Sequence, residues 1–182
     1  MAPPSPTPAA AAPSLSDAQT LVLAEAEAAR VAASGKPYQW SGSTTSGFDC
    51  SGFVIYVFNK AYGVNTLARV TADQLRTQGR FPGVTGAHQA ADLVFFSKTA
   101  GGSTASHVGI VIDDKEWIGS QSSTGVARVK FSNSYWKPLI MGYGRYELIT
   151  SAHAIIPMRA GSFASPIRMA STGQGIGRSA RA

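Results

Sequence analysis

The stretch DCSGFVIYVF at residues 49–58 decides the fold of this chain. Its large apolar residues recur at the three- and four-residue spacing of one helical face, which predicts a helix that buries this face. Asp49 suits the N-cap position, where a carboxylate accepts a hydrogen bond from a free backbone N–H group. The turn-rich segment 41–47 leads into it. The sequence therefore predicts a central helix with Cys50, the single cysteine, at its N-terminus.

Two further helices are expected, over residues 17–34 and 72–78. Ahead of each stands a serine or threonine with glutamine three residues later, which is the capping-box pattern. A glycine follows each segment and is a typical helix stop. Three helices are thus predicted in the first half of the chain.

Beyond residue 90 the pattern changes to short runs of β-branched and aromatic residues separated by Gly, Ser, Asp and Asn. Such runs predict a meandering antiparallel sheet. Helices first and strands second indicate an α+β domain, with helices packed on a central antiparallel β-sheet. No period of about 20 to 50 residues recurs, which excludes repeat architectures. The expected strands are 92–97, 107–112, 116–119, 126–131 and 142–149.

Length and composition predict one domain between two arms. The chain has 182 residues, of which 44% are hydrophobic, enough for one core. Residues 1–15 are rich in proline and alanine and predict an extended arm. Residues 151–182 hold four arginines and no acid, or +4 of the net charge of +6, and predict a basic, flexible tail. The domain itself is expected over 16–150, as a monomer.

Several classes of protein are excluded by what the sequence lacks. The longest apolar run, residues 53–58, is far below the roughly 18 residues of a membrane span. No basic aromatic module indicates nucleic acid as a partner. One cysteine forms no internal disulfide, and no Cys-x-x-Cys pair or close histidine pair predicts a metal site or another cofactor.

Cys50 is the candidate nucleophile. At the first turn of a helix, free N–H groups and the helix dipole favour a thiolate. A proton acceptor is also required, and His107 is expected to open an apolar strand beside a flexible loop. The alternatives are a packed thiol and a strand-end histidine bonded to the backbone. His88 and His153 are expected to face solvent.

Four motifs together resemble the NlpC/p60 family of papain-like cell-wall peptidases. The similarity covers residues 17 to about 148, and 57 residues separate the cysteine from the strand histidine. In that family the cysteine begins the central helix and the histidine begins a strand of the sheet. The motifs are Tyr38-x-Trp40-Ser41-Gly42, Asp49-Cys50-Ser51-Gly52-Phe53, Asp92-Leu93-Val94-Phe95-Phe96 and His107-Val108-Gly109-Ile110.

The resemblance implies a cysteine peptidase or amidase that hydrolyses peptidoglycan stem peptides, commonly between γ-D-glutamate and the diamino acid. Cys50 would attack the carbonyl and His107 would carry the proton, while the Cys50 backbone N–H stabilises the oxyanion. Tyr38 matches the family tyrosine at the same site, or else is a half-buried aromatic with a bonded hydroxyl. Asp49 and Ser51 match substrate-contacting positions, with the carboxylate available for a free stem-peptide amine.

The third catalytic position departs from the family pattern. The resemblance places a polar residue, often histidine, twelve positions after the strand histidine, and here this residue is Gly119. Gln121 would face the same side of a strand, and its amide oxygen could orient His107. The alternatives are a Cys–His dyad, a backbone carbonyl or Ser120.

Other functions stay open. A non-catalytic wall-binding module would keep the fold, and Gly119 is the residue that favours this alternative. A papain-like hydrolase or acyltransferase acting on another amide or ester is a third hypothesis. The aromatic residues Trp117, Tyr135, Trp136 and Tyr143 are expected in core and sheet-edge packing, without a function.

The N-terminus has no basic region followed by an apolar one, so no signal peptide is expected. We therefore expect a protein that acts at the bacterial cell wall or periplasm after export by a non-Sec route. One hypothesis is an antibacterial effector, a toxin delivered by a specialised secretion or phage-like apparatus. An immunity protein that blocks the Cys50 cleft would then be its partner.

Overall fold

The computed structural model describes residues 16–63 and 66–147, so the two predicted arms and His153 lie outside the described residues. Helices and strands follow the predicted order, with a two-strand hairpin and a 3₁₀ turn added. In chain order they are α1 (Asp17–Ala32), β1 (Ser43–Thr44), β2 (Gly47–Phe48), α2 (Cys50–Tyr62), α3 (Ala72–Thr77), β3 (Leu93–Ser97), β4 (Ala105–Val111), β5 (Glu116–Gln121), β6 (Gly125–Lys130), η1 (Lys137–Leu139) and β7 (Ile140–Gly144).

Both predicted capping boxes are confirmed. At the start of α1 the Ser16 hydroxyl accepts a hydrogen bond from the Gln19 backbone N–H at 3.2 Å, and Gln19 Oε1 accepts one from the Ser16 N–H at 2.9 Å. Thr71 and Gln74 make the same exchange ahead of α3. Each box satisfies backbone donors that the helix leaves free, which is why these starts are readable in sequence.

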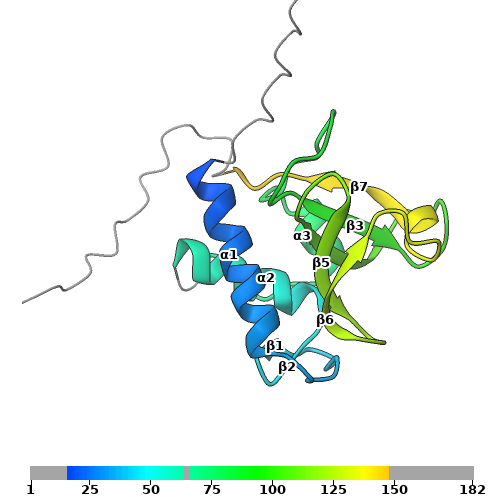
Figure 1. Ribbon diagram of the computed structural model, residues 1–182. Helices are drawn as coiled ribbons and strands as arrows, with labels where there is room; N and C mark the ends of the chain where they lie inside the picture. Colours follow the sequence, from blue (N-terminus) through cyan, green and yellow to red (C-terminus); the bar gives the residue numbers. More distant parts are fainter. Residues whose placement is uncertain (1–15, 64–65, 148–182) are drawn as a thin grey trace, which may run out of the picture.

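The sheet is antiparallel throughout, in the order β6-β5-β4-β3-β7, and confirms the α+β class. Figure 1 shows α1 and α2 on one side of it. The predicted simple meander is wrong at its last strand, because β7 pairs with β3 and not with β6. β3 is buried along its whole length, so its backbone groups need a strand at both edges.

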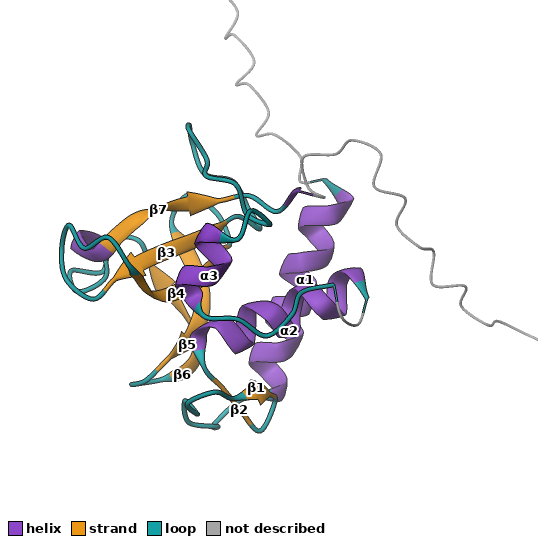
Figure 2. Cartoon of the chain, turned by 180° about the vertical axis from the view of Figure 1, so that it is seen from behind, coloured by secondary structure: helices purple, strands orange, loops and turns teal. Residues whose placement is uncertain are grey.

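The helix α2 forms the centre of the core. It begins at Cys50, as the sequence predicts, and packs on β4 and β5, while α1 packs on α2 and α3 on β4 (Figure 2). Its apolar face is fully buried at Phe53, Val54, Val57 and Phe58. Burial of each such side chain stabilises the fold by roughly 1.5–3 kcal/mol.

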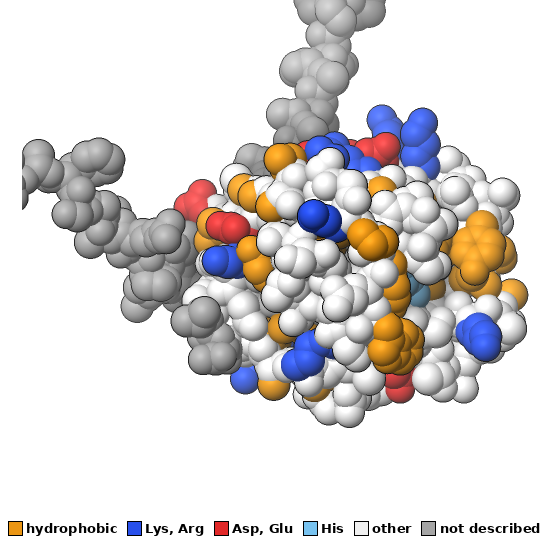
Figure 3. All heavy atoms as spheres, turned by 90° about the horizontal axis from the view of Figure 1, so that it is seen from below, with side chains coloured by type: hydrophobic (Ala, Val, Ile, Leu, Met, Phe, Trp, Pro, Cys, Tyr) orange, Lys and Arg blue, Asp and Glu red, His pale blue; other side chains and the backbone are white. Residues whose placement is uncertain are grey.

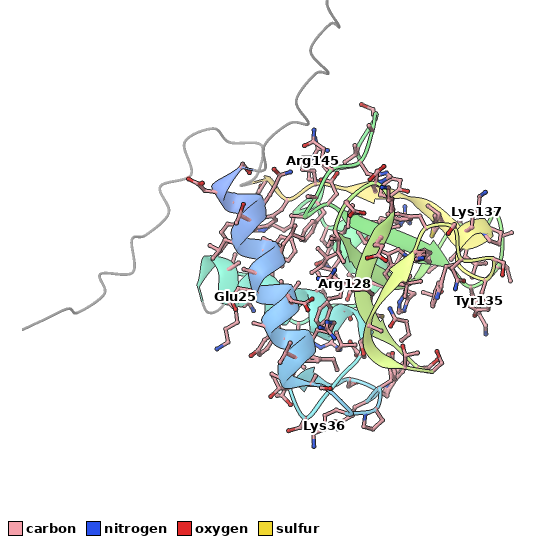
Figure 4. All side chains as sticks on the ribbon, in the orientation of Figure 1. Glu25, Lys36, Arg128, Tyr135, Lys137 and Arg145 are labelled. Atoms are coloured by element: carbon pink, nitrogen blue, oxygen red, sulfur yellow. The ribbon has the colours of Figure 1, made fainter. Side chains whose placement is uncertain are left out.

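A second cluster, built around Phe96 and Trp117, covers the other face of the sheet, with Trp136 and Tyr143 packed against it. This confirms the packing expected of Trp117, Trp136 and Tyr143. Tyr135 is different, because 66% of its surface is exposed. It lies at the edge of the molecule remote from α1, whereas Arg128 of β6 points toward that helix and pairs with Glu27 at 3.1 Å (Figure 4).

Among the residues that the structure describes, none of the helices combines the length and the hydropathy that a membrane span requires.

Candidate functional site

A close backbone contact positions the start of α2. The Asp49 carboxylate caps the helix by accepting from the Gly52 backbone N–H at 2.6 Å, which confirms the predicted N-cap. The Asp49 N–H in turn donates to the Gly42 carbonyl at 2.9 Å. A β-carbon on Gly52 would lie only 2.0 Å from that same oxygen. The segment before the β1–β2 hairpin and the helix therefore meet where only glycine fits, and Cys50 lies at this junction.

The Cys50 thiol is buried beside β4. Backbone N–H groups of Ser51, Val108 and Cys50 itself act on the sulfur and favour a thiolate. Burial, and then the neighbouring Asp49 carboxylate, nevertheless raise the pKa of the thiol above its usual value. The expectation of a lowered pKa is wrong, since only 7% of Cys50 is exposed and desolvation outweighs the helix N-terminus.

Tyr38 lies at the same sulfur. Its hydroxyl interacts with both the backbone N–H and the side chain of Cys50. Burial, together with the neighbouring Cys50 and Asp49 side chains, raises the pKa of Tyr38 to about 12, so the phenol stays protonated and can donate a hydrogen bond. The structure thus brings together the two residues that the resemblance implied for one site.

His107 is enclosed by aromatic rings. Trp136 stacks on its imidazole with ring centroids 4.6 Å apart, and Phe96 and Trp117 approach at 5.8 Å. Burial lowers the pKa of His107 to about 4, so the ring is neutral at pH 7. The prediction that His107 opens its strand is wrong, because β4 begins two residues earlier, at Ala105. Within the described residues its buried Nε2 has no hydrogen-bond partner.

Cys50 and His107 line two different cavities that adjoin. The Cys50 cavity has a volume of about 660 Å³, and the His107 cavity about 210 Å³. Tyr38, Lys98 and Ser106 line both of them. The end of the molecule that carries the β1–β2 hairpin shows apolar patches separated by polar surface, with a small part of a histidine side chain visible between two of them (Figure 3).

The Asp49 carboxylate also pairs with Arg69, a residue that the sequence analysis did not identify. Arg69 donates from Nη1 to the Ser51 hydroxyl at 2.7 Å, and that hydroxyl donates to Asp49 Oδ1 at 3.2 Å. These three side chains line the Cys50 cavity as one network. Arg69 lies in the loop after α2, where a lone arginine carries no pattern that would have marked it.

Matching to a family model agrees with this geometry. Residues 35–145 match the model of the NlpC/P60 family, which is more than half of the chain. The chain belongs to the NlpC/P60 family. The matched range begins after α1 and contains all of the strands and every residue of the site described above.

Relatives of this NlpC/P60 chain include peptidoglycan endopeptidases. The probable peptidoglycan endopeptidase LytE of Bacillus subtilis is 39% identical over 112 residues, 62% of this chain and 31% of the relative. The bifunctional muramidase/DL-endopeptidase CwlT of the same species is 36% identical over 114 residues, 62% of this chain and 33% of the relative. The chain therefore spans about a third of the length of these relatives.

Solved NlpC/P60 structures share the fold. A lipoprotein-like member from Staphylococcus aureus has a TM-score of 0.56 at 27% identity, covering 76% of this chain and 45% of that one. RipD of Mycobacterium tuberculosis, described as a non-catalytic domain adapted to peptidoglycan binding, has a TM-score of 0.51 at 16% identity, covering 73% of this chain and 99% of that one. The latter likeness shows the fold alone.

The third catalytic position of the family pattern is Gly119, which has no side chain, but the Gln121 side chain extends to this position. Gly119 and Gln121 share a face of β5 with Trp117, and the Trp117 ring approaches the His107 imidazole with centroids 5.8 Å apart. Gln121 Nε2 lies 3.3 Å from where a β-carbon on Gly119 would stand. The Gln121 amide therefore extends back over the glycine, on the face that carries His107.

The remaining polar candidates have other roles in the described structure. Ser120 donates its hydroxyl to the Phe48 carbonyl at 2.8 Å, which ties β5 to β2. His88 was expected to face solvent, but it stacks on Tyr143 with ring centroids 4.4 Å apart. Across residues 16–63 and 66–147 no group of three His, Cys, Asp or Glu side chains could hold a metal ion.

Proposed function

We propose that this NlpC/P60 domain is a cysteine endopeptidase that hydrolyses peptidoglycan stem peptides at the bacterial cell wall, between γ-D-glutamate and the diamino acid. One observation carries the proposal. The Cys50 thiol, at the start of α2, lines a cavity with the Tyr38 hydroxyl, and this cavity adjoins the one lined by His107. The peptidoglycan endopeptidases among the relatives support the substrate class.

The proposed reaction is an acyl transfer that begins from neutral groups. Burial keeps Cys50 as a thiol and His107 as a neutral imidazole. With Nε2 buried, Nδ1 of His107 is left to take the thiol proton as sulfur attacks the carbonyl carbon. The proton then passes to the leaving amine. Water attacks the thioester, His107 takes and returns its proton, and the acid product leaves.

The oxyanion would be held by two donors that converge on Cys50. These are the backbone N–H of Cys50 and the Tyr38 hydroxyl, which interact with each other in the described site. Loss of one such donor costs about 100- to 1000-fold in rate in a well-studied hydrolase. Tyr38 is suited to this role because its raised pKa keeps it protonated.

Gln121 is proposed as the positioning residue for His107. Its Oε1 accepts a hydrogen bond from the Thr124 hydroxyl at 3.1 Å, while its buried Nε2, like His107 Nε2, lacks a partner in the described residues. The terminal amide of a glutamine can rotate by about 180° about its last side-chain bond. Turning the amide over places the oxygen at the Gly119 side, and the nitrogen can still donate to Thr124. The oxygen then becomes an acceptor on the His107 face of the sheet.

The network of Asp49, Ser51 and Arg69 is proposed to bind the stem peptide ahead of the scissile bond. Asp49 has one oxygen committed to the helix cap and the other to Arg69. A substrate amine would therefore bind a carboxylate that already accepts from the Gly52 N–H and pairs with Arg69. We infer that Arg69 and Ser51 hold the Asp49 carboxylate in place for that contact.

A non-catalytic wall-binding module is the second candidate function. The unpartnered Nε2 atoms of His107 and Gln121 and the raised pKa of Cys50 favour it. Stem-peptide binding through Asp49 and Arg69 would be unaffected by these features. The two candidates differ in whether Cys50 is needed for bond cleavage.

Mass spectrometry of purified muropeptides, after incubation with the protein and with Cys50→Ala, tests the proposal. We expect products cut between D-glutamate and the diamino acid only with the intact cysteine. Cleavage at the cross-link would retain the mechanism and change the bond. Stems that bind both proteins but are never cleaved would establish the binding module instead.

A further inference from the structure

Lys98 occupies the boundary between the two cavities. It is the first residue after β3, its side chain is exposed, and it lines both the Cys50 cavity and the His107 cavity. Ser106, also exposed, lines both cavities as well. A substrate whose carbonyl lies between Cys50 and His107 would therefore pass beside these two side chains.

The charges around the cavities leave Lys98 without a counterion. The charged residues that line them are Asp49, Arg69 and Lys98. Asp49 and Arg69 neutralise each other in their ion pair. Lys98 makes no ion pair with any of the described residues. The two cavities together thus carry one uncompensated positive charge, which attracts an anionic group on a ligand.

We propose that Lys98 and Ser106 form a subsite for a substrate carboxylate next to the scissile bond, so that the domain prefers stems with free carboxylates over amidated ones. The inference rests on the proposed function. A γ-linked D-glutamate keeps its α-carboxylate free, and meso-diaminopimelate carries another carboxylate beyond the cleaved amide. Amidation of either removes the charge and keeps the shape. An ammonium and a hydroxyl are suitable donors to either carboxylate.

Three synthetic stem tetrapeptides test the subsite: one with both carboxylates free, one amidated at D-glutamate and one amidated at diaminopimelate. We measure kcat/KM for each with the full chain, Lys98→Met, Lys98→Arg and Lys115→Met. Lys115 is a matched control, because it is an exposed cation outside both cavities. Binding of the same peptides to Cys50→Ala, with and without Lys98→Met, gives a readout that does not require cleavage.

We expect the free stem to be preferred about 10-fold over one amidated stem, since amidation removes a charge-assisted hydrogen bond whose contribution is reduced by solvent exposure. Lys98→Met should abolish this preference, Lys98→Arg should keep most of it, and Lys115→Met should not change it. The amidated stem that is disfavoured identifies the carboxylate. A preference in binding that depends on Lys98, without any cleavage, would support the subsite and overturn the proposed function. If the wild-type chain cleaves all three stems at equal rates, or if Lys98→Met keeps the wild-type preference, the subsite alone is overturned.

Discussion

The side-chain nitrogen of Gln121 lies over Gly119, 3.3 Å from where a β-carbon on that glycine would stand. A side chain two residues along the strand therefore fills the space that the family pattern gives to position 119. Because residues two apart on a strand share a face, a polar side chain at position 121 lies on the same side of the sheet as one at position 119, which is the His107 side.

Gln121→Leu is expected to lower kcat by about 10- to 100-fold with little change in KM, since the imidazole would lose its orienting partner. Gln121→Glu should shift the acid limb of kcat/KM upward from about pH 4, because a carboxylate near His107 would raise its pKa. The pH profiles of both variants on a soluble stem peptide provide the measurement. A Gln121→Glu enzyme with the wild-type acid limb would show that Gln121 does not contact His107.

Cys50 should alkylate slowly at neutral pH. Its pKa is raised by burial and by the Asp49 carboxylate, and the thiolate is the reactive form. We expect the pH midpoint of iodoacetamide alkylation to lie above that of a cysteine peptide blocked at both ends, in the same buffer. Asp49→Asn, which can still cap α2, should lower the midpoint. A wild-type midpoint below that of the free thiol would mean that the helix N-terminus outweighs burial.

Helix starts and the α+β class were predictable because their causes are local. The capping boxes of α1 and α3 and the apolar face of α2 each lie within a few consecutive residues. The pairing of β7 with β3 was not predictable in this way, because edge selection depends on β3 being buried on both faces. Strand runs in sequence show period and length but not neighbours.

In the candidate site too, features set by local sequence were predictable and features set by the tertiary fold were not. Cys50, His107 and Tyr38 were identifiable because they lie in motifs of fixed spacing. Arg69 was missed because only the folded loop brings it to Asp49, 20 residues away in sequence. The pKa of Cys50 was mispredicted because a helix N-terminus is visible in sequence, whereas the depth of burial is not.

Gly52→Ala should disrupt the site through the backbone. The added methyl would lie 2.0 Å from the Gly42 carbonyl oxygen, so the segment at Gly42 or the helix must move. We expect the free energy of unfolding to fall by about 1–3 kcal/mol, which is typical of overpacking, and most of the activity to be lost. Gly86→Ala is the matched control, because nothing lies within 4 Å of its β-carbon position and its φ is not in the left-handed region. Unchanged activity in Gly52→Ala, measured beside urea denaturation, would contradict the argument.

Arg145→Met should strongly destabilise the fold. Asp92 is fully buried, and Arg145 donates to both of its oxygens at 2.8 Å. Removing the guanidinium leaves a buried carboxylate without its counterion, which costs about 3–5 kcal/mol. Arg80→Met breaks the exposed pair with Glu147 and should cost less than about 1 kcal/mol. Urea denaturation of both variants compares them, and equal losses would show that Asp92 does not depend on its ion pair.

His107 should make the fold sensitive to acid. Its pKa is about 4 in the folded protein, below the usual 6.5, so the unfolded chain binds the proton first as pH falls. Stability is therefore full above pH 6.5 and is lost progressively down to about pH 4, by about 3 kcal/mol in total. His107→Phe removes this titration and keeps a ring for Trp136 to stack on. We expect the free energy of unfolding of the wild type minus that of His107→Phe, measured in urea at intervals between pH 7 and 4, to fall by about 3 kcal/mol as pH falls, because the other titrating groups are common to both. Parallel curves would mean that the imidazole is not desolvated in the folded state.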